Sequence, residues 1–173
     1  MGLRYRAGQF WRLLFAAPLA TAAWQDVAAV LSPAELRLFA RFSAGDQQHS
    51  YDVLCTLRAA GYENAELLAA ALLHDVGKTR VRLSVWERSL IVLAQRLFPG
   101  RLAAWGGGAA RGWRRPFVVK QQHPAWGAEM AAAAGAAPLV VSLIRRHQDA
   151  VLETAVTPED ALLRQLQWAD DRN

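Results

Sequence analysis

Cysteine and lysine are almost absent from this sequence. Cys55 is the only cysteine among 173 residues, which excludes an intramolecular disulfide and a cysteine-rich zinc site. We expect its thiol to be buried, because it lies in a helical pattern beside leucines. Lys78 and Lys120 are the only lysines, so the net charge of +5 comes almost wholly from arginine. Arginine suits phosphate, but a bias of composition explains its excess as well, and charge alone does not indicate a nucleic-acid partner.

The N-terminus lacks an apolar run long enough to cross a bilayer, which takes about 20 residues. Its apolar run covers residues 13–23 and follows Arg4, Arg6 and Arg12, as in a signal peptide. Pro18 interrupts the run, which favours an ordinary first helix, with an amphipathic helix on a membrane surface as the alternative. We expect a cytoplasmic protein, either free or in peripheral contact with a membrane.

No stretch shows the sustained alternation of apolar and polar residues that marks β-strands. Apolar residues make up 53% of the chain and charged residues 20%, a composition typical of folded rather than disordered proteins. The apolar spacing predicts an all-α fold of seven or eight helices. We expect residues 1–44 to form helices that pack on a core domain of residues 45–173.

Caps and breakers set the expected helix ends. Ser32 and Pro33 predict a helix start, a break is expected at Gly45-Asp46, and Gly61 and Gly77 are expected to end the next two helices. The predicted helices cover about residues 33–42, 47–60, 64–76, 84–98, 124–134, 137–149 and 158–171. Residues 79–120 are read as an insertion made of an apolar helix and a mobile, basic, glycine-rich loop.

The histidines and two of the aspartates fall on the inward faces of predicted helices. A single inward histidine is usually a hydrogen-bonded core residue, but burying an ionised carboxylate costs several kcal/mol unless it is paired or bound to a metal. Their shared placement predicts a cation site, for which imidazole and carboxylate favour Mn, Fe, Zn or Ni over Mg or Ca. The residues concerned are His49, His74, His123, His147, Asp75 and Asp170.

The order of these residues resembles the H…HD…D pattern of HD-domain phosphohydrolases over about residues 45–171. The resemblance rests on His49, on the string His74-Asp75-Val76-Gly77-Lys78 and on Ala169-Asp170. It implies a helical bundle in which one metal is bound by His49, His74, Asp75 and Asp170. The segment from His123 to Glu129 and the later His147 resemble those of binuclear members, which implies a second metal with Asp75 bridging the pair.

The resemblance implies hydrolysis of a phosphate ester or anhydride by a metal-bound hydroxide, with one or two divalent ions, Mn or Fe before Zn or Ni. The expected partner is a small phosphorylated substrate, a nucleotide above all. The Gly-Tyr-Pro segment of cyclic-di-GMP phosphodiesterases is missing, and so is the acidic extension of ppGpp hydrolases. The small hydrolases of diadenosine tetraphosphate are closer in size, but share too little sequence to transfer their substrate.

Three cationic side chains near the predicted ligands are candidates for contacting phosphate. Lys78 lies one turn after Asp75 and is expected to assist catalysis, with a solvent-exposed lysine as the alternative. Arg145 and Arg146 flank His147 and rank lower, because they can also cap a helix C-terminus.

The basic loop over residues 105–115 is expected either to close over a nucleotide or to lie on an acidic membrane surface. Specific nucleic-acid binding is not expected. The alternatives to an enzyme are a catalytically silent nucleotide sensor or adaptor and a peripheral membrane-associated module, and the sequence does not indicate the oligomeric state.

Overall fold

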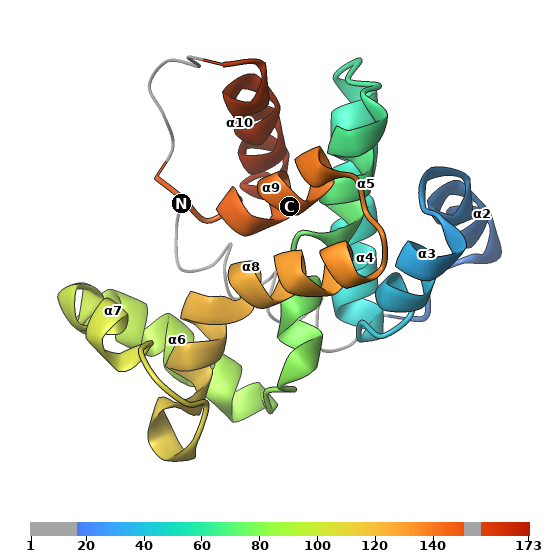
Figure 1. The fold of residues 1–173 in the computed structure, drawn as a ribbon. Coiled ribbons are helices and arrows are strands. Elements are labelled where there is room, and N and C mark those ends of the chain that lie inside the picture. Colours follow the sequence, from blue (N-terminus) through green and yellow to red (C-terminus); the bar gives the residue numbers. More distant parts are fainter. Residues whose placement is uncertain (1–16, 151–156) are drawn as a thin grey trace.

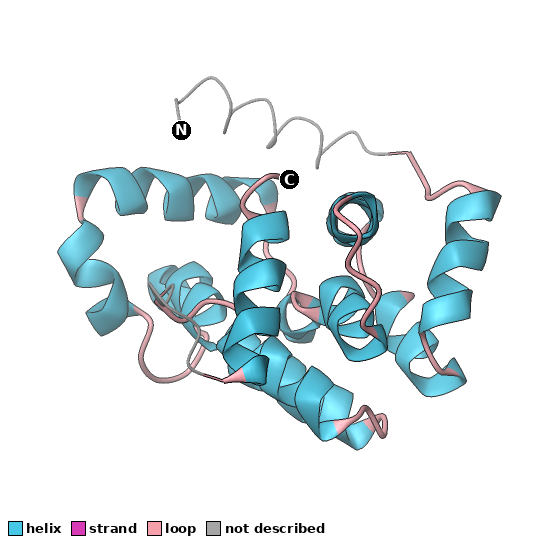
Figure 2. Cartoon of the chain, turned by 90° about the horizontal axis from the view of Figure 1, so that it is seen from above, coloured by secondary structure: helices cyan, strands magenta, loops and turns pink. Residues whose placement is uncertain are grey.

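The computed structural model describes residues 17–150 and 157–173, in which all regular elements are helices, as predicted (Figures 1 and 2). Residues 13–16 of the predicted apolar run lie outside these ranges. No helix within the two ranges is both long and apolar enough to cross a membrane. The α-helices are α2 (Thr21–Val30), α3 (Pro33–Phe39), α4 (Ala44–Ala59), α5 (Ala65–Leu73), α6 (Val85–Leu97), α7 (Leu102–Trp105), α8 (Arg115–Ala133), α9 (Pro138–Arg146) and α10 (Pro158–Asp170). The 3₁₀ helices are η1 (Val76–Arg80), η2 (Pro99–Arg101) and η3 (Gly112–Arg114).

Side-chain caps start several of these helices where the sequence predicted them. Ser32 and Thr157 each form a reciprocal capping box with the residue three positions later, and Asn64 accepts a hydrogen bond from the Leu67 amide. Gly61 ends α4 with a φ of 80°, a left-handed conformation that favours glycine. These local signals therefore acted as expected.

The predicted boundaries at the starts of α4 and α8 are wrong. No break occurs at Gly45-Asp46, because Ser43 caps α4 and accepts a hydrogen bond from the Asp46 amide. Helix α8 starts at Arg115 and runs through Pro124, so the expected loop before it is shorter. A proline removes one backbone donor from a helix, and the surrounding packing holds α8 together across that gap.

Helix α5 lies at the centre of the bundle. All of its residues from Leu67 to Leu73 are buried, and α4, α9 and α10 pack around it, with α2 and α3 against another side. Val27 and Phe39 from the two N-terminal helices are fully buried in the same core. The expectation of a buried Cys55 is wrong, since the residue is exposed. It lies on the side of α4 opposite the stripe that buries Val53 and Leu57.

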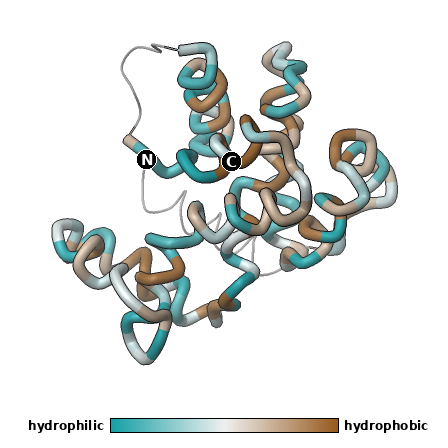
Figure 3. Tube along the Cα trace, viewed as in Figure 1, coloured by the Kyte–Doolittle hydropathy of each residue, from teal (hydrophilic) through white to brown (hydrophobic). Residues whose placement is uncertain are grey.

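Helices α6 and α7 form a separate part of the molecule, which we call the α6–α7 lobe (residues 85–114). In Figure 1 the lobe lies at the end of the molecule opposite α2 and α3. It packs on the bundle mainly through the contact of α6 with α8. The hydropathy colouring of Figure 3 shows apolar segments in this lobe as well as in the bundle.

Candidate metal centre

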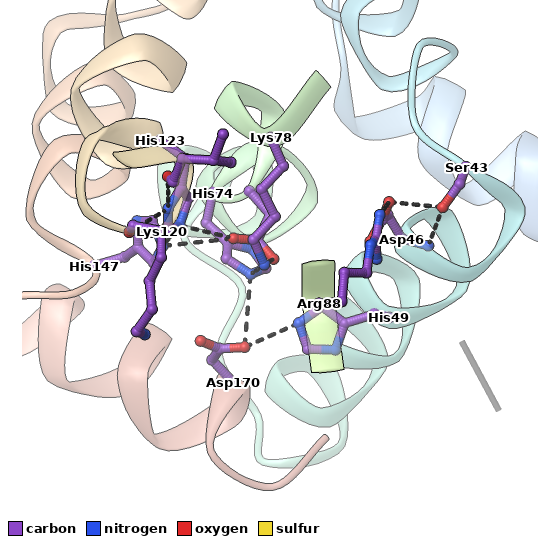
Figure 4. Close-up of polar contacts among 12 residues, drawn as sticks. Ser43, Asp46, His49, His74, Lys78, Arg88, Lys120, His123, His147 and Asp170 are labelled. Atoms are coloured by element: carbon purple, nitrogen blue, oxygen red, sulfur yellow. Dashed lines mark hydrogen bonds and ion pairs between the residues drawn. The ribbon is translucent and has the colours of Figure 1, made fainter. Parts of the chain in front are cut away.

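The six predicted metal ligands converge at one place in the bundle, although they come from five parts of the chain (Figure 4). Helix termini bring most of them there: two residues follow the end of α5, one follows α9 and one ends α10. The ligands are His49 on α4, His74 and Asp75 between α5 and η1, His123 on α8, His147 after α9 and Asp170 on α10. They form two groups of three, within each of which the ligand atoms lie within 4.8 Å of one another.

The first group contains His49, His74 and Asp170. The Nε2 atoms of His49 and His74 lie 3.0 Å and 3.5 Å from the same oxygen, Oδ1 of Asp170. His74 is fully buried, while the side chains of His49 and Asp170 are 20% and 26% exposed. This group therefore lies at the solvent side of the centre, where a substrate can reach it.

The second group contains Asp75, His123 and His147, all buried. Oδ1 of Asp75 lies 3.2 Å from Nε2 of His123 and 3.7 Å from Nε2 of His147. The other oxygen of Asp75, Oδ2, lies 3.5 Å from Nε2 of His74 in the first group. Asp75 thus presents one carboxylate oxygen to each group, which is the placement required of a bridging ligand.

Unused backbone carbonyls orient the buried histidines. The last carbonyls of a helix lack an intrahelical partner, and Nδ1 of His74 bonds the Ala71 carbonyl at 2.9 Å, just as Nδ1 of His147 bonds Ile144 at 2.7 Å. A carbonyl can only accept, so Nδ1 carries the proton in both rings. Each Nε2 is therefore the atom that faces the centre, as in metal-binding histidines.

A free backbone carbonyl also orients His123, although this residue lies in the middle of a helix. Pro124 has no N–H to donate to the Lys120 carbonyl four residues earlier, and Nδ1 of His123 bonds this carbonyl at 2.9 Å instead. The His-Pro dipeptide therefore fixes the ring with Nε2 toward Asp75. This contact gives a physical reason for a proline inside α8.

The donor atoms fit divalent transition metals. The Nε2 atoms of His123 and His147 lie 3.2 Å apart and both face the Asp75 carboxylate. Two unprotonated ring nitrogens this close repel each other, and a cation or a proton bound by them would remove the repulsion. Nε2 of His74 is buried without a hydrogen-bond partner in the described residues. Imidazole nitrogens and buried carboxylates in such an array have the chemistry to hold a divalent transition metal ion.

Two glycines allow the backbones of η1 and α8 to meet. A Cβ atom on Gly77 would lie 1.9 Å from the His123 carbonyl oxygen and 2.7 Å from the Gly127 nitrogen. The predicted helix stop at Gly77 is wrong, because α5 ends at Leu73 and Gly77 lies within η1 without a positive φ. The close approach is what requires a glycine here. The contact places Asp75 beside His123, and it explains why both segments need a glycine.

Burial and opposite charges shift the pKa values at the centre. Burial opposes the charged form of His74, but the carboxylates of Asp75 and Asp170 outweigh it and raise the pKa to about 9. For the Asp75 carboxyl, Lys78 and His74 outweigh burial and hold its pKa well below its usual range. Burial lowers the pKa of His123 to about 4. Without metal, one proton on His74 thus compensates the carboxylates, while His123 stays neutral.

Both lysines of the chain lie near the ligands. Lys78 donates to Oδ2 of Asp75 in a short ion pair, and its side chain is 38% exposed. Lys120, whose carbonyl holds His123, extends its side chain past His147 on the Asp170 side of the view in Figure 4. Sequence reasoning did not single out Lys120, although its position three residues before His123 places it on the same helical face.

Arg146, a predicted substrate contact, forms ion pairs with two carboxylates of α10. Its guanidinium donates to Glu159 at 2.6 Å and to Asp160 at 2.7 Å, and these bonds raise its pKa. The guanidinium is therefore used to hold the end of α9 against α10. Arg145 is exposed, and neither arginine makes a side-chain hydrogen bond or ion pair to a candidate ligand in the described residues. Gln167, also missed, donates to the His147 carbonyl at 3.3 Å and so fixes the turn that carries this ligand.

A family model described as HD domain matches residues 47–172, a range that includes all six ligands. No curated protein and no solved structure gives a significant match.

Proposed function

Because the chain belongs to the HD-domain family, a family of metal-dependent phosphohydrolases, we propose that it hydrolyses phosphate esters or anhydrides at a centre for two divalent metal ions. The observation that carries this proposal is the position of Asp75, which directs one oxygen to each group of ligands. A single metal would not need both groups.

Each group would hold one ion: His49, His74 and Asp170 the first, and His123 and His147 the second, with Asp75 near both groups. When bound, such ions polarise a phosphoryl oxygen and lower the pKa of water toward neutrality. The histidines bind as neutral ligands and the two aspartates carry two negative charges, so two divalent ions leave a surplus of about two positive charges. The centre then attracts an anion.

The chain's own cations complete the binding of a phosphoryl group. Lys78 uses one of its three N–H donors on Asp75, so it can keep this bond and donate a second hydrogen to a substrate oxygen. Lys120 is a second candidate for contacting the substrate, because it lies on the side of the ligands opposite to Lys78 (Figure 4). Arg146 is left out, because Glu159 and Asp160 occupy its donors.

A small cationic cavity supports a substrate with more than one phosphate. It has a volume of about 130 Å³, and Lys78 connects it to the metal centre. The Arg88 guanidinium makes two bonds of 3.2 Å to Asp46, and the two charges cancel. Arg41 and Arg82 also line the cavity, and their side chains have no partner in the part of the chain that the structure describes.

The cavity is smaller than the roughly 300 Å³ of a pocket for a whole organic ligand. It suits one phosphate rather than a nucleoside. The proposed substrate therefore has its scissile phosphoryl group at the metals and a second phosphate between Arg41 and Arg82, as in a nucleotide with several phosphates.

The general proposal is tested with the purified protein, loaded with Mn or Fe under anaerobic conditions. We expect turnover of bis-p-nitrophenyl phosphate and of nucleotides that is lost in His74→Ala and Asp75→Asn, with metal content measured on the same samples. Full metal occupancy without hydrolysis of any substrate would instead favour a catalytically silent sensor.

The substrate proposal is tested with Arg41→Gln and Arg82→Gln. These changes should raise KM for a nucleoside polyphosphate and leave KM for p-nitrophenyl phosphate, which has one phosphate, unchanged. Arg37→Gln on α3 removes the same charge outside the cavity and is the control. Equal effects on both substrates would refute the second phosphate site without affecting the general proposal.

A further inference from the structure

One region of the chain combines arginine with exposed apolar side chains and lacks carboxylates. Between Arg88 and Ala128 the sequence contains seven basic residues and no aspartate or glutamate. The region includes most of α6, α7 and the first two-thirds of α8. No part of the proposed reaction uses the surface of the α6–α7 lobe.

The outward face of α6 is apolar. Its buried side carries Glu87 and Ala94, and Glu87 accepts a 3.2 Å bond from Arg115 of α8. The exposed positions recur every three or four residues and so form one stripe along the helix. They are Val85, Trp86, Ser89, Val92, Leu93, Arg96 and Leu97. The helix thus presents its apolar residues to solvent and its glutamate to the protein, the reverse of an ordinary surface helix.

Exposed apolar residues are concentrated in this lobe. All large hydrophobic side chains that are exposed in the described residues lie between Val85 and Trp113. Trp86 is 64% exposed, Trp113 59% and Leu97 56%. Contiguous apolar surface of this kind marks a site of protein or membrane contact.

A shallow apolar hollow joins α6 to the chain that follows it. Its volume is about 170 Å³, and Leu93 and Leu97 from the exposed stripe line it together with Trp105 and Trp113. The aromatic rings contact each other, with Trp105 and Trp113 at 5.6 Å between centroids. The exposed residues of α6 and the tryptophans therefore form one continuous surface.

Arginines without partners lie in the same lobe. Arg96 belongs to the exposed stripe of α6, and Arg101 and Arg111 are exposed in the segment between α6 and α8. Their side chains make no hydrogen bond or ion pair to any residue in 17–150 or 157–173. By contrast, Arg88 and Arg115 are neutralised by Asp46 and Glu87. The free positive charge thus accompanies the exposed apolar side chains.

We propose that the α6–α7 lobe docks on the surface of a membrane that contains anionic lipids. Tryptophan, leucine and phenylalanine side chains enter the boundary between headgroups and acyl chains, and Arg96, Arg101 and Arg111 bind lipid phosphates. Charge complementarity selects this occupant, since the only carboxylate of the lobe, Glu87, is buried and paired with Arg115 and cannot repel an anionic surface. Aliphatic residues such as Leu93 and Leu97 favour acyl chains over nucleic acid, which binds through stacking and phosphate contacts.

The test is cosedimentation of the full-length protein with vesicles of phosphatidylcholine alone or mixed with phosphatidylglycerol. We expect binding to the anionic vesicles that weakens as salt is raised. Arg96→Gln and Arg101→Gln should each weaken it about fivefold, and the pair Leu93→Gln with Leu97→Gln should abolish it. Arg164→Gln, which removes an exposed charge on α10, is the matched control and should bind like the wild type.

Several results would overturn the proposal. One is that the leucine double variant binds anionic vesicles as well as the wild type does. Another is that Arg164→Gln weakens vesicle binding as much as Arg96→Gln does. Another is a dimer in light scattering that the leucine variant dissociates, because the face is then covered by a second copy. A clearly lowered melting temperature of that variant also overturns it, since the face is then covered by other residues of the same chain. None of these measurements depends on hydrolysis, so the proposed enzyme activity stands or falls separately.

Discussion

The metal centre and the α6–α7 lobe place polar and apolar side chains in opposite ways. At the centre, buried positions hold His74, Asp75 and His123, whereas in the lobe exposed positions hold Trp86 and Leu97. Charged residues are rarely buried without partners, and large exposed apolar patches are rare in monomers. We propose that a partner from outside the described chain completes each region: cations for the first, and an apolar, anionic surface for the second.

The two regions also differ in how strongly they should respond to mutation. Side chains at the centre are fixed by backbone carbonyls, ion pairs and a glycine contact, so one change disturbs several others. Exposed residues of the lobe pack on little, and their replacement should barely affect folding. Mutations at the centre should therefore have large effects on activity or stability, and mutations in the lobe small ones.

Asp75→Asn should cause the largest loss. The change removes a ligand charge from both groups at once, and we expect turnover to fall by at least about a thousandfold, with a lower metal content. Metal analysis and hydrolysis of bis-p-nitrophenyl phosphate measure both effects. Glu129→Gln, which removes an exposed carboxylate paired with Arg80 at 3.0 Å, should leave both unchanged. If both variants behave alike, Asp75 is not a bridging ligand.

Gly77→Ala should destabilise the fold on the order of 3 kcal/mol. The added Cβ would lie 1.9 Å from the His123 carbonyl oxygen, so η1 must move away from α8. Gly100→Ala is the matched control, because no atom lies within 4 Å of a Cβ there and its φ is not positive. Urea unfolding compares the two variants. Similar midpoints would show that the η1–α8 contact is not tight.

Metal affinity should depend on pH through His74. Its pKa in the metal-free protein is raised to about 9, so below that pH a metal must displace a proton, and affinity should rise by up to about tenfold per pH unit toward pH 9. Conversely, the stability that the protonated ring adds to the metal-free protein is complete below pH 6.5 and lost as pH rises through about 9. Calorimetric titration and melting of metal-free protein from pH 6 to 10 test both signs. A flat affinity would contradict the assignment.

Trp86→Ser in the lobe should have the smallest effect on folding and catalysis. The side chain is 64% exposed, and we expect a change in stability within about 0.5 kcal/mol and normal hydrolysis. Leu143→Ala in the core, which is fully buried, should instead cost roughly 3 kcal/mol. Thermal unfolding of the two variants gives the comparison. A large loss for Trp86→Ser would mean that this ring is covered in the folded protein.

Much of the fold followed from local signals. The caps at Ser32, Asn64 and Thr157 and the stop at Gly61 act within one helical turn, and all are found where they were predicted. The start of α8 was missed because a proline locally favours the first turn of a helix, so Pro124 was taken as the start. That the helix instead continues through Pro124 depends on its packing with η1 and α9.

The ligands were named from the sequence because a buried histidine or aspartate needs a partner wherever it lies. The pattern also indicated their family. What it did not reveal is which residues hold the ligands in place. Gly127 and Gln167 act on residues of other elements, and composition and periodicity carry no trace of such contacts. Lys120 acts on His123 through its backbone carbonyl, and only its helical spacing from His123 could have indicated it.

The sequence by itself thus determined the helices, the inward faces and the candidate ligand set, since these depend on side-chain chemistry and on spacing along one helix. Only the tertiary structure decided that the ligands divide into two groups around Asp75, that Arg146 binds Glu159 rather than lying free, and that α6 exposes its apolar face. The physical reason is that these outcomes depend on distances between elements far apart in the chain, which packing fixes and local propensity does not.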